Sequence, residues 1–156
     1  MSIFVACGHT MATYCSQNLG AHRWDRIHRG MKAGYRITCL WCAVVLLLVY
    51  TLAPTLIVMI TGSSDAIMIH AADKYLRIDT ILYFLVAIIF IQRNSMQGIG
   101  DTVTPLISSG IEMVGKILLA FTLVPAMGYD GVILVEPIVW IVMIIPLVLK
   151  IRKWER

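Results

Sequence analysis

The stretch ITCLWCAVVLLLVYTLAPTLIVMITGSS, residues 37–64, contains no charged side chain. A helix needs about 20 consecutive, mostly apolar residues to cross the ~30 Å hydrocarbon core of a bilayer, and this stretch is long enough. Strands of a membrane barrel would instead be segments of about ten residues with alternating hydrophobicity, a pattern that this continuous apolar stretch does not show. The stretch therefore predicts a transmembrane α-helix over residues 37–61.

The composition of the whole chain also indicates a membrane protein. Of the 156 residues, 59% are hydrophobic and only 14% are charged, whereas about a quarter of the residues in soluble domains are charged. The formal net charge is +4, but the basic residues fall in two blocks that flank apolar stretches. We therefore expect the lipid bilayer, and not a nucleic acid, as the partner.

Further apolar stretches lie on both sides of the first one. We predict helices over the ranges 1–21, 37–61, 76–97, 104–125 and 131–150. The first range has no formal charge but carries His9, Gln17 and Asn18, so we interpret it as the end of a membrane helix partly buried against protein. The predicted fold is an all-α integral membrane protein with four full transmembrane helices and a partial fifth at the N-terminus, in a single membrane domain over residues 1–156.

A glycine-rich turn separates two of these predicted helices. Gly98, Gly100 and Asp101 are expected to end one helix, and Thr104 with Pro105 fits an N-cap and a first-turn proline of the next. The turn is too short for a linker between soluble domains. It predicts an antiparallel helical hairpin.

The distribution of lysine and arginine predicts the orientation in the membrane. Residues 23–36 hold five basic side chains and the tail 150–156 holds four, whereas residues 62–75 hold one and residues 125–131 hold none. Basic residues in short loops mark the cytoplasmic side. Four predicted crossings place the two basic segments on the same side. We therefore expect a multi-pass protein of the cell membrane with a cytoplasmic C-terminus.

No constellation typical of an enzyme is present. Cys39 and Cys42 form a CxxC pair, but they lie within a predicted membrane helix without a second pair or a nearby histidine, so we expect them to pack. The histidines lack metal-binding spacing, and no nucleophile lies in a recognisable pattern with a base. The sequence predicts no enzyme, no metal site and no cofactor.

Charged residues within the predicted spans are the candidate functional residues. A charge at the centre of a span costs roughly 2.5–3.5 kcal/mol on insertion scales, so such residues usually face a bundle interior. Glu112 and Lys116 share one helix face at the i, i+4 spacing that favours an ion pair. Arg93 lies eight residues before Asp101 and Glu112 lies eleven after it. This offset of three residues is about 4.5 Å along a helix, so we expect Arg93 to reach Glu112 across the hairpin.

Each of these residues has a simpler interpretation. Glu112 and Lys116 could form a purely structural ion pair, and Arg93 could serve only as an anchor at the membrane interface. Asp79 is expected near one end of its span and is the weaker candidate. Glu136 is expected nearer the outer surface, where hydration alone would account for it.

Two segments of the chain closely resemble the carboxy-terminal half of multidrug and toxic compound extrusion (MATE) transporters. They are ATYCSQNLGAHRWDRIHRG, residues 12–30, and RNSMQGIGDTVTPLISSGIEMVGKILLAFTLVPAMGYDGVILVEPIVWIV, residues 93–142. The resemblance implies two six-helix lobes and the exchange of cations or protons for organic, often cationic, compounds. It also implies that this chain supplies the end of the eighth helix and helices nine to twelve, all within the MATE-type helical bundle.

The chain departs from the family pattern in two ways. The first lobe and the seventh helix are absent, so the chain resembles a truncated reading frame or fragment whose partner would be the missing N-terminal lobe. The middle of the helix predicted over 76–97, LYFLVAIIF, carries no acid, so a sodium site seen in some relatives is not carried over. The coupling ion stays open between a proton and sodium.

The predicted function is the carboxy-terminal part of a multidrug efflux antiporter coupled to cations or protons. The substrates would be small organic, often cationic, compounds. Glu112 is the expected ionisable switch, with Lys116 and Arg93 as its partners. One alternative is a lipid-linked saccharide flippase of the wider superfamily, which should have a more cationic cavity to hold pyrophosphate. The other is an inactive truncated membrane fragment.

Overall fold

The computed structural model describes residues 2–62 and 65–154, and within these ranges the chain forms helices and short connections but no strand. The helices are α1 (Ser2–Gly20), α2 (Trp24–Thr61), α3 (Ala66–Ile81), α4 (Tyr83–Gly98), α5 (Val103–Met127) and α6 (Tyr129–Trp154). In this part of the chain α2, α5 and α6 are long and apolar enough to cross a membrane, and α3 with α4 passes the same test only as a pair bent by 48°, which is either a broken span or a re-entrant loop. The predicted all-α membrane fold is confirmed. Five residues of the predicted domain over 1–156 lie outside the described residues, namely Met1, Ser63, Ser64, Glu155 and Arg156.

Helix α2 begins much earlier than the charge-free stretch. Its first residue is Trp24, so the basic segment 23–36, predicted to be a loop, is almost entirely helical. Lysine and arginine are good helix formers, and Asp25 in the first turn pairs with Arg29 one turn later at 2.6 Å. A helix of 38 residues is about 57 Å long, well over the ~30 Å hydrocarbon core. The basic end of α2 therefore extends beyond the hydrocarbon.

The span predicted over residues 76–97 is longer and is broken in the middle. Helix α3 already begins at Ala66, where the Asp65 carboxylate accepts a hydrogen bond from the Ile67 amide at 2.9 Å. In the middle of α3, Asp73 and Arg77 form an i, i+4 ion pair at 2.8 Å, which favours the helical state of this polar segment. The break falls at Leu82. Asp79 therefore lies beside the bend, in the middle of the α3–α4 pair, and not near one end of a continuous helix as predicted.

The turn between α4 and α5 is capped by an aspartate. One oxygen of the Asp101 carboxylate accepts from the Thr104 amide at 3.1 Å, and the other accepts from the Thr104 hydroxyl at 2.9 Å. The predicted N-cap at Thr104 is wrong, since α5 begins at Val103 and Asp101 supplies the capping oxygen. Burial alone would raise the pKa of Asp101, but these hydrogen bonds and the Lys150 ammonium at 3.3 Å outweigh it and lower the pKa.

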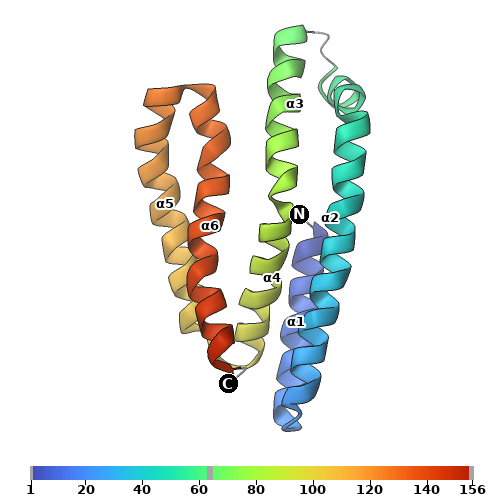
Figure 1. Cartoon of the computed structure of the whole chain (residues 1–156), viewed down its shortest axis with the longest axis vertical. Helices are drawn as coiled ribbons and strands as arrows, with labels where there is room; N and C mark the ends of the chain where they lie inside the picture. Colours follow the sequence, from blue (N-terminus) through green and yellow to red (C-terminus); the bar gives the residue numbers. More distant parts are fainter. Residues whose placement is uncertain (1, 63–64, 155–156) are drawn as a thin grey trace.

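The helices run back and forth between two ends of the molecule (Figure 1). The α1–α2 turn, the α4–α5 turn and the end of α6 lie at one end, and the α5–α6 turn lies at the other end with the start of α3. The two basic segments of the sequence are therefore brought to the same end. At the opposite end, Lys74 on α3 pairs with Asp130 on α6, and the Tyr129 hydroxyl donates to the Ala71 carbonyl at 3.0 Å.

Close helix packing joins α1 to α4 and α5 to α6. A Cβ added at Gly98 would lie 2.9 Å from the carbonyl carbon of Ala12 on α1 and closer still to its oxygen. In the α5–α6 hairpin, the buried Ser108 hydroxyl donates to the Met143 carbonyl at 2.9 Å. Large apolar side chains on the outer face of α5 remain exposed, among them Leu106 and Phe121. This face is suited to contact with lipid or with other protein.

Candidate functional site

The charged pair predicted across the hairpin is present. Arg93 lies on α4 and its guanidinium is 3.3 Å from a carboxylate oxygen of Glu112 on α5. It also donates to the Ser109 hydroxyl, which in turn donates to the Pro105 carbonyl at 3.0 Å. Both members of the pair are half-buried, with 26% and 29% of their side chains exposed. The guanidinium is thus held by two groups on one face of α5.

Lys116 extends this pair into a chain of charges over three helices. Its ammonium lies 3.2 Å from the second carboxylate oxygen of Glu112 and 3.0 Å from Glu136 on α6. The order Arg93, Glu112, Lys116, Glu136 alternates in sign, so each neighbour compensates the next. Hydration alone does not account for Glu136, because its carboxylate forms an ion pair with the half-buried Lys116 of α5. We call these four residues the charge chain.

Asp79 faces the same region from the bend between α3 and α4. Its side chain is buried, with 8% of the residue exposed, and Tyr83 follows it four residues later, at the start of α4. Among the described residues, no lysine or arginine lies within ion-pair distance of its carboxylate. Asp79 is therefore the acidic group of this region that lacks a cation.

A pocket of about 230 Å³ lies between α3, α4, α5 and α6 and joins these groups. It is lined by the charge chain together with Tyr75, Asp79, Val86, Ile89, Phe90, Trp140 and Met143. Three carboxylates face two basic side chains, so the pocket has an excess of negative charge when all are ionised. Apolar and aromatic side chains supply the rest of the wall. Such a lining suits a small cation with an apolar body.

Four of the charged residues that line the pocket were identified from the sequence, and the other lining residues were not. Arg93, Glu112, Lys116 and Asp79 all line the pocket. Glu136 could have been found by counting across the α5–α6 turn. From Gly128, Lys116 is twelve residues back and Glu136 eight residues on, an offset of four residues or about 6 Å. Tyr75 and Trp140 each lie four residues from a pocket carboxylate, Asp79 and Glu136 respectively.

The cysteines and histidines form no comparable site. Cys39 and Cys42 are free, as are Cys7 and Cys15. In the part of the chain that the structure describes, no group of three or more histidine, cysteine, aspartate or glutamate side chains is placed to hold a metal ion.

Comparison with known proteins gives one match. A family model described as MatE matches residues 1–122, which include α1 to α4 and most of α5. No curated protein matches the chain, and no solved structure does.

Proposed function

Because the chain belongs to the MatE family of membrane transporters, we propose that it is the carboxy-terminal part of a cation- or proton-coupled antiporter. Its substrates would be organic, often cationic, compounds exported from the cell. In this proposal the protein is a transporter and not an enzyme. A second lobe, preceding these helices in the full transporter, would complete the path of the substrate.

The excess of acidic over basic side chains in the pocket between α3, α4, α5 and α6 is the observation that supports this proposal. Asp79, Glu112 and Glu136 oppose only Arg93 and Lys116 around one small cavity. A charge inside a span is costly and usually marks an ion or substrate path. An excess of acids supports a cationic ligand, whereas a flippase for lipid-linked saccharides would need a cationic cavity to hold pyrophosphate. The arrangement thus supports the antiporter over the flippase.

Glu112 is the proposed switch of this pocket. When ionised, it holds Arg93 of α4 and Lys116 of α5 through its two oxygens. A proton on Glu112 would remove the charge that both cations share. Lys116 would keep Glu136, but Arg93 would keep only the Ser109 hydroxyl, so the contact between α4 and α5 would weaken. Protonation thus favours one arrangement of the helices over another, which is what coupling requires. Asp79, without a cation of its own, is the proposed contact for the substrate or the coupling ion.

Binding of tetraethylammonium, a small organic cation, tests the proposal. The purified chain in lipid nanodiscs is expected to bind this cation, and Asp79→Asn is expected to weaken binding about tenfold to a hundredfold. The reason is the loss of a charged contact, whose typical contribution is about 1.5–3 kcal/mol. Affinity is measured by equilibrium dialysis of the radiolabelled cation.

The matched control is Asp130→Asn, which removes one negative charge outside the pocket and should leave the affinity within twofold. Equal losses in both variants would mean that only the overall charge matters. Pyrophosphate binding that Lys116→Gln weakens would place the anion in this pocket and would support the flippase.

The proposal places the protein in the cell membrane with both basic segments in the cytoplasm. In a background without native cysteines, Met127→Cys at the end of α5 should react with an impermeant maleimide added to intact cells. Ala21→Cys, at the α1–α2 turn, should react only after the cells are opened. Both positions are exposed, so accessibility within the fold does not separate them. The reverse labelling pattern would overturn this orientation.

A further inference from the structure

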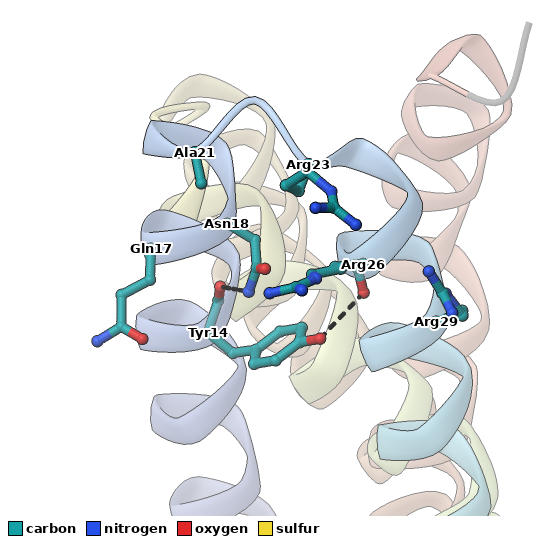
Figure 2. Close-up of a pocket in the computed structure, with 7 residues that line it drawn as sticks. All are labelled: Tyr14, Gln17, Asn18, Ala21, Arg23, Arg26 and Arg29. Atoms are coloured by element: carbon teal, nitrogen blue, oxygen red, sulfur yellow. Dashed lines mark hydrogen bonds between the residues drawn. The ribbon is translucent and has the colours of Figure 1, made fainter.

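A second pocket lies far from the charge chain, at the turn between α1 and α2 (Figure 2). Its volume is about 790 Å³. It is lined by Tyr14, Gln17, Asn18, Ala21, Arg23, Arg26 and Arg29, and we call it the arginine pocket. Figure 2 shows the guanidinium groups of Arg23 and Arg26 between the two helices near Asn18, while Gln17 points away.

Hydrogen bonds fix the shape of the arginine pocket. The Arg23 amide donates to the Asn18 carbonyl at 2.9 Å and so closes the turn. The buried Asn18 side chain donates to the Tyr14 carbonyl at 2.8 Å, and the Tyr14 hydroxyl donates to the Arg26 carbonyl at 3.3 Å. The tyrosine ring lies directly against Gly30, where an added Cβ would approach the ring Cδ1 atom to 2.8 Å. The floor of the pocket is therefore held in place without a ligand.

The charge of the arginine pocket is unbalanced. Asp25 pairs with Arg23 at 3.2 Å and with Arg29 at 2.6 Å. Among the described residues, no carboxylate lies within ion-pair distance of Arg26. Three guanidinium groups and one carboxylate leave two uncompensated positive charges. The first turn of α2, whose amides carry partial positive charge, adds to this field.

From this geometry we infer that the arginine pocket binds a phosphate group, carried by a lipid headgroup or by a small soluble organic phosphate. The planar fork of arginine matches phosphate oxygens and forms paired, charge-assisted hydrogen bonds with them. The partial positive charge at the start of a helix favours the same anion. The segment 24–36 extends beyond the hydrocarbon, so both kinds of ligand can reach it. This inference is independent of the transport proposal, because it concerns a separate pocket.

Binding of three matched ligands tests the inference and separates the two sources of phosphate. The purified chain in neutral detergent is titrated with dioctanoyl phosphatidylglycerol, with dioctanoylglycerol and with glycerol 3-phosphate. Bound ligand is counted by native mass spectrometry. We expect phosphatidylglycerol to bind and dioctanoylglycerol, which lacks the phosphate, not to bind. If glycerol 3-phosphate binds as tightly as phosphatidylglycerol, the site is assigned to soluble phosphates. If glycerol 3-phosphate binds much more weakly than the lipid, the site is assigned to a lipid headgroup.

Arg26→Gln is the decisive variant, because it removes the unpaired guanidinium and breaks no ion pair among the described residues. The affinity for the phosphate ligand should fall about fivefold, the effect of one basic contact to an anionic headgroup. Arg36→Gln removes the same charge from α2 outside the pocket lining and should change the affinity less than twofold. Unchanged circular dichroism would show that both variants keep their helices.

Gly30→Ala tests the shape of the pocket without altering its charge. The new methyl group must displace the Tyr14 ring, so phosphate affinity should fall although all three arginines remain. The inference is overturned if no phosphate ligand binds, or if Arg36→Gln weakens binding as much as Arg26→Gln.

Discussion

The double replacement of Arg93 and Glu112 by glutamine should destabilise the chain less than the sum of the two single replacements. Each single variant leaves a half-buried charge without its partner, since Arg93 and Glu112 lie 3.3 Å apart on α4 and α5. We expect each to lower the free energy of unfolding by about 1.5–3 kcal/mol. The coupling energy should fall in the range of about 0.5–3 kcal/mol found for residues in contact. Unfolding of the purified chain in mixed micelles provides the measurement.

The matching cycle at Lys74 and Asp130 is the control. That pair also joins two helices, but 43% and 53% of its side chains are exposed, so its coupling should be about 0–1 kcal/mol. If the losses at Arg93 and Glu112 simply add, the two residues are not coupled and Glu112 is not the proposed switch.

Gly98→Ala should destabilise the bundle far more than the same methyl addition at an open helical position. The added Cβ meets the carbonyl oxygen of Ala12 and lies 2.9 Å from its carbonyl carbon. These are backbone atoms, so no side chain can rotate away and α1 must shift from α4. Overpacking a tight contact costs about 1–3 kcal/mol, and the rigid neighbour places this substitution at the upper end. The measured quantity is the free energy of unfolding in micelles.

Gly110→Ala is the control for this substitution. An added Cβ at Gly110 has nothing within 4 Å, and alanine is favoured over glycine in a helix by about 0.5–1 kcal/mol. This variant should be neutral or slightly stabilised. A tolerated Gly98→Ala would show that α1 and α4 are not held at this separation.

The sequence alone was sufficient for features that depend on short-range patterns. Charge-free stretches such as residues 37–61 indicate spans because few other structures accommodate so many apolar residues in succession. The contact between Arg93 and Glu112 could be predicted by counting residues from the short turn. In two antiparallel helices, residues that are equally far from the turn lie side by side. The roles of these residues in transport remain proposals.

Other features depend on contacts that composition does not reveal. To predict that residues 24–36 are helical, one would have to know that this basic segment continues the helix of the span that follows it. The position of Asp79 beside a bend depends on the early start of α3, which polar residues such as Asp73 obscure in the sequence. Glu136 forms its ion pair with Lys116, which lies on another helix. These three errors arose where polar residues were assigned to a loop or a span end by their polarity alone.

The ion pairs between helices have a consequence for how the bundle can loosen. Among the described residues, the pairs that join different helices are Lys74–Asp130, Arg93–Glu112 and Lys116–Glu136, and Lys150 joins α6 to the α4–α5 turn. All of them involve α5 or α6, whereas α1 meets α4 through close backbone packing at Gly98. Ionic strength and protons therefore act selectively on the attachment of the α5–α6 hairpin. In acid or at high salt, the backbone amides of this hairpin should exchange their hydrogens faster, while the exchange rates of the α1 and α4 amides should stay low.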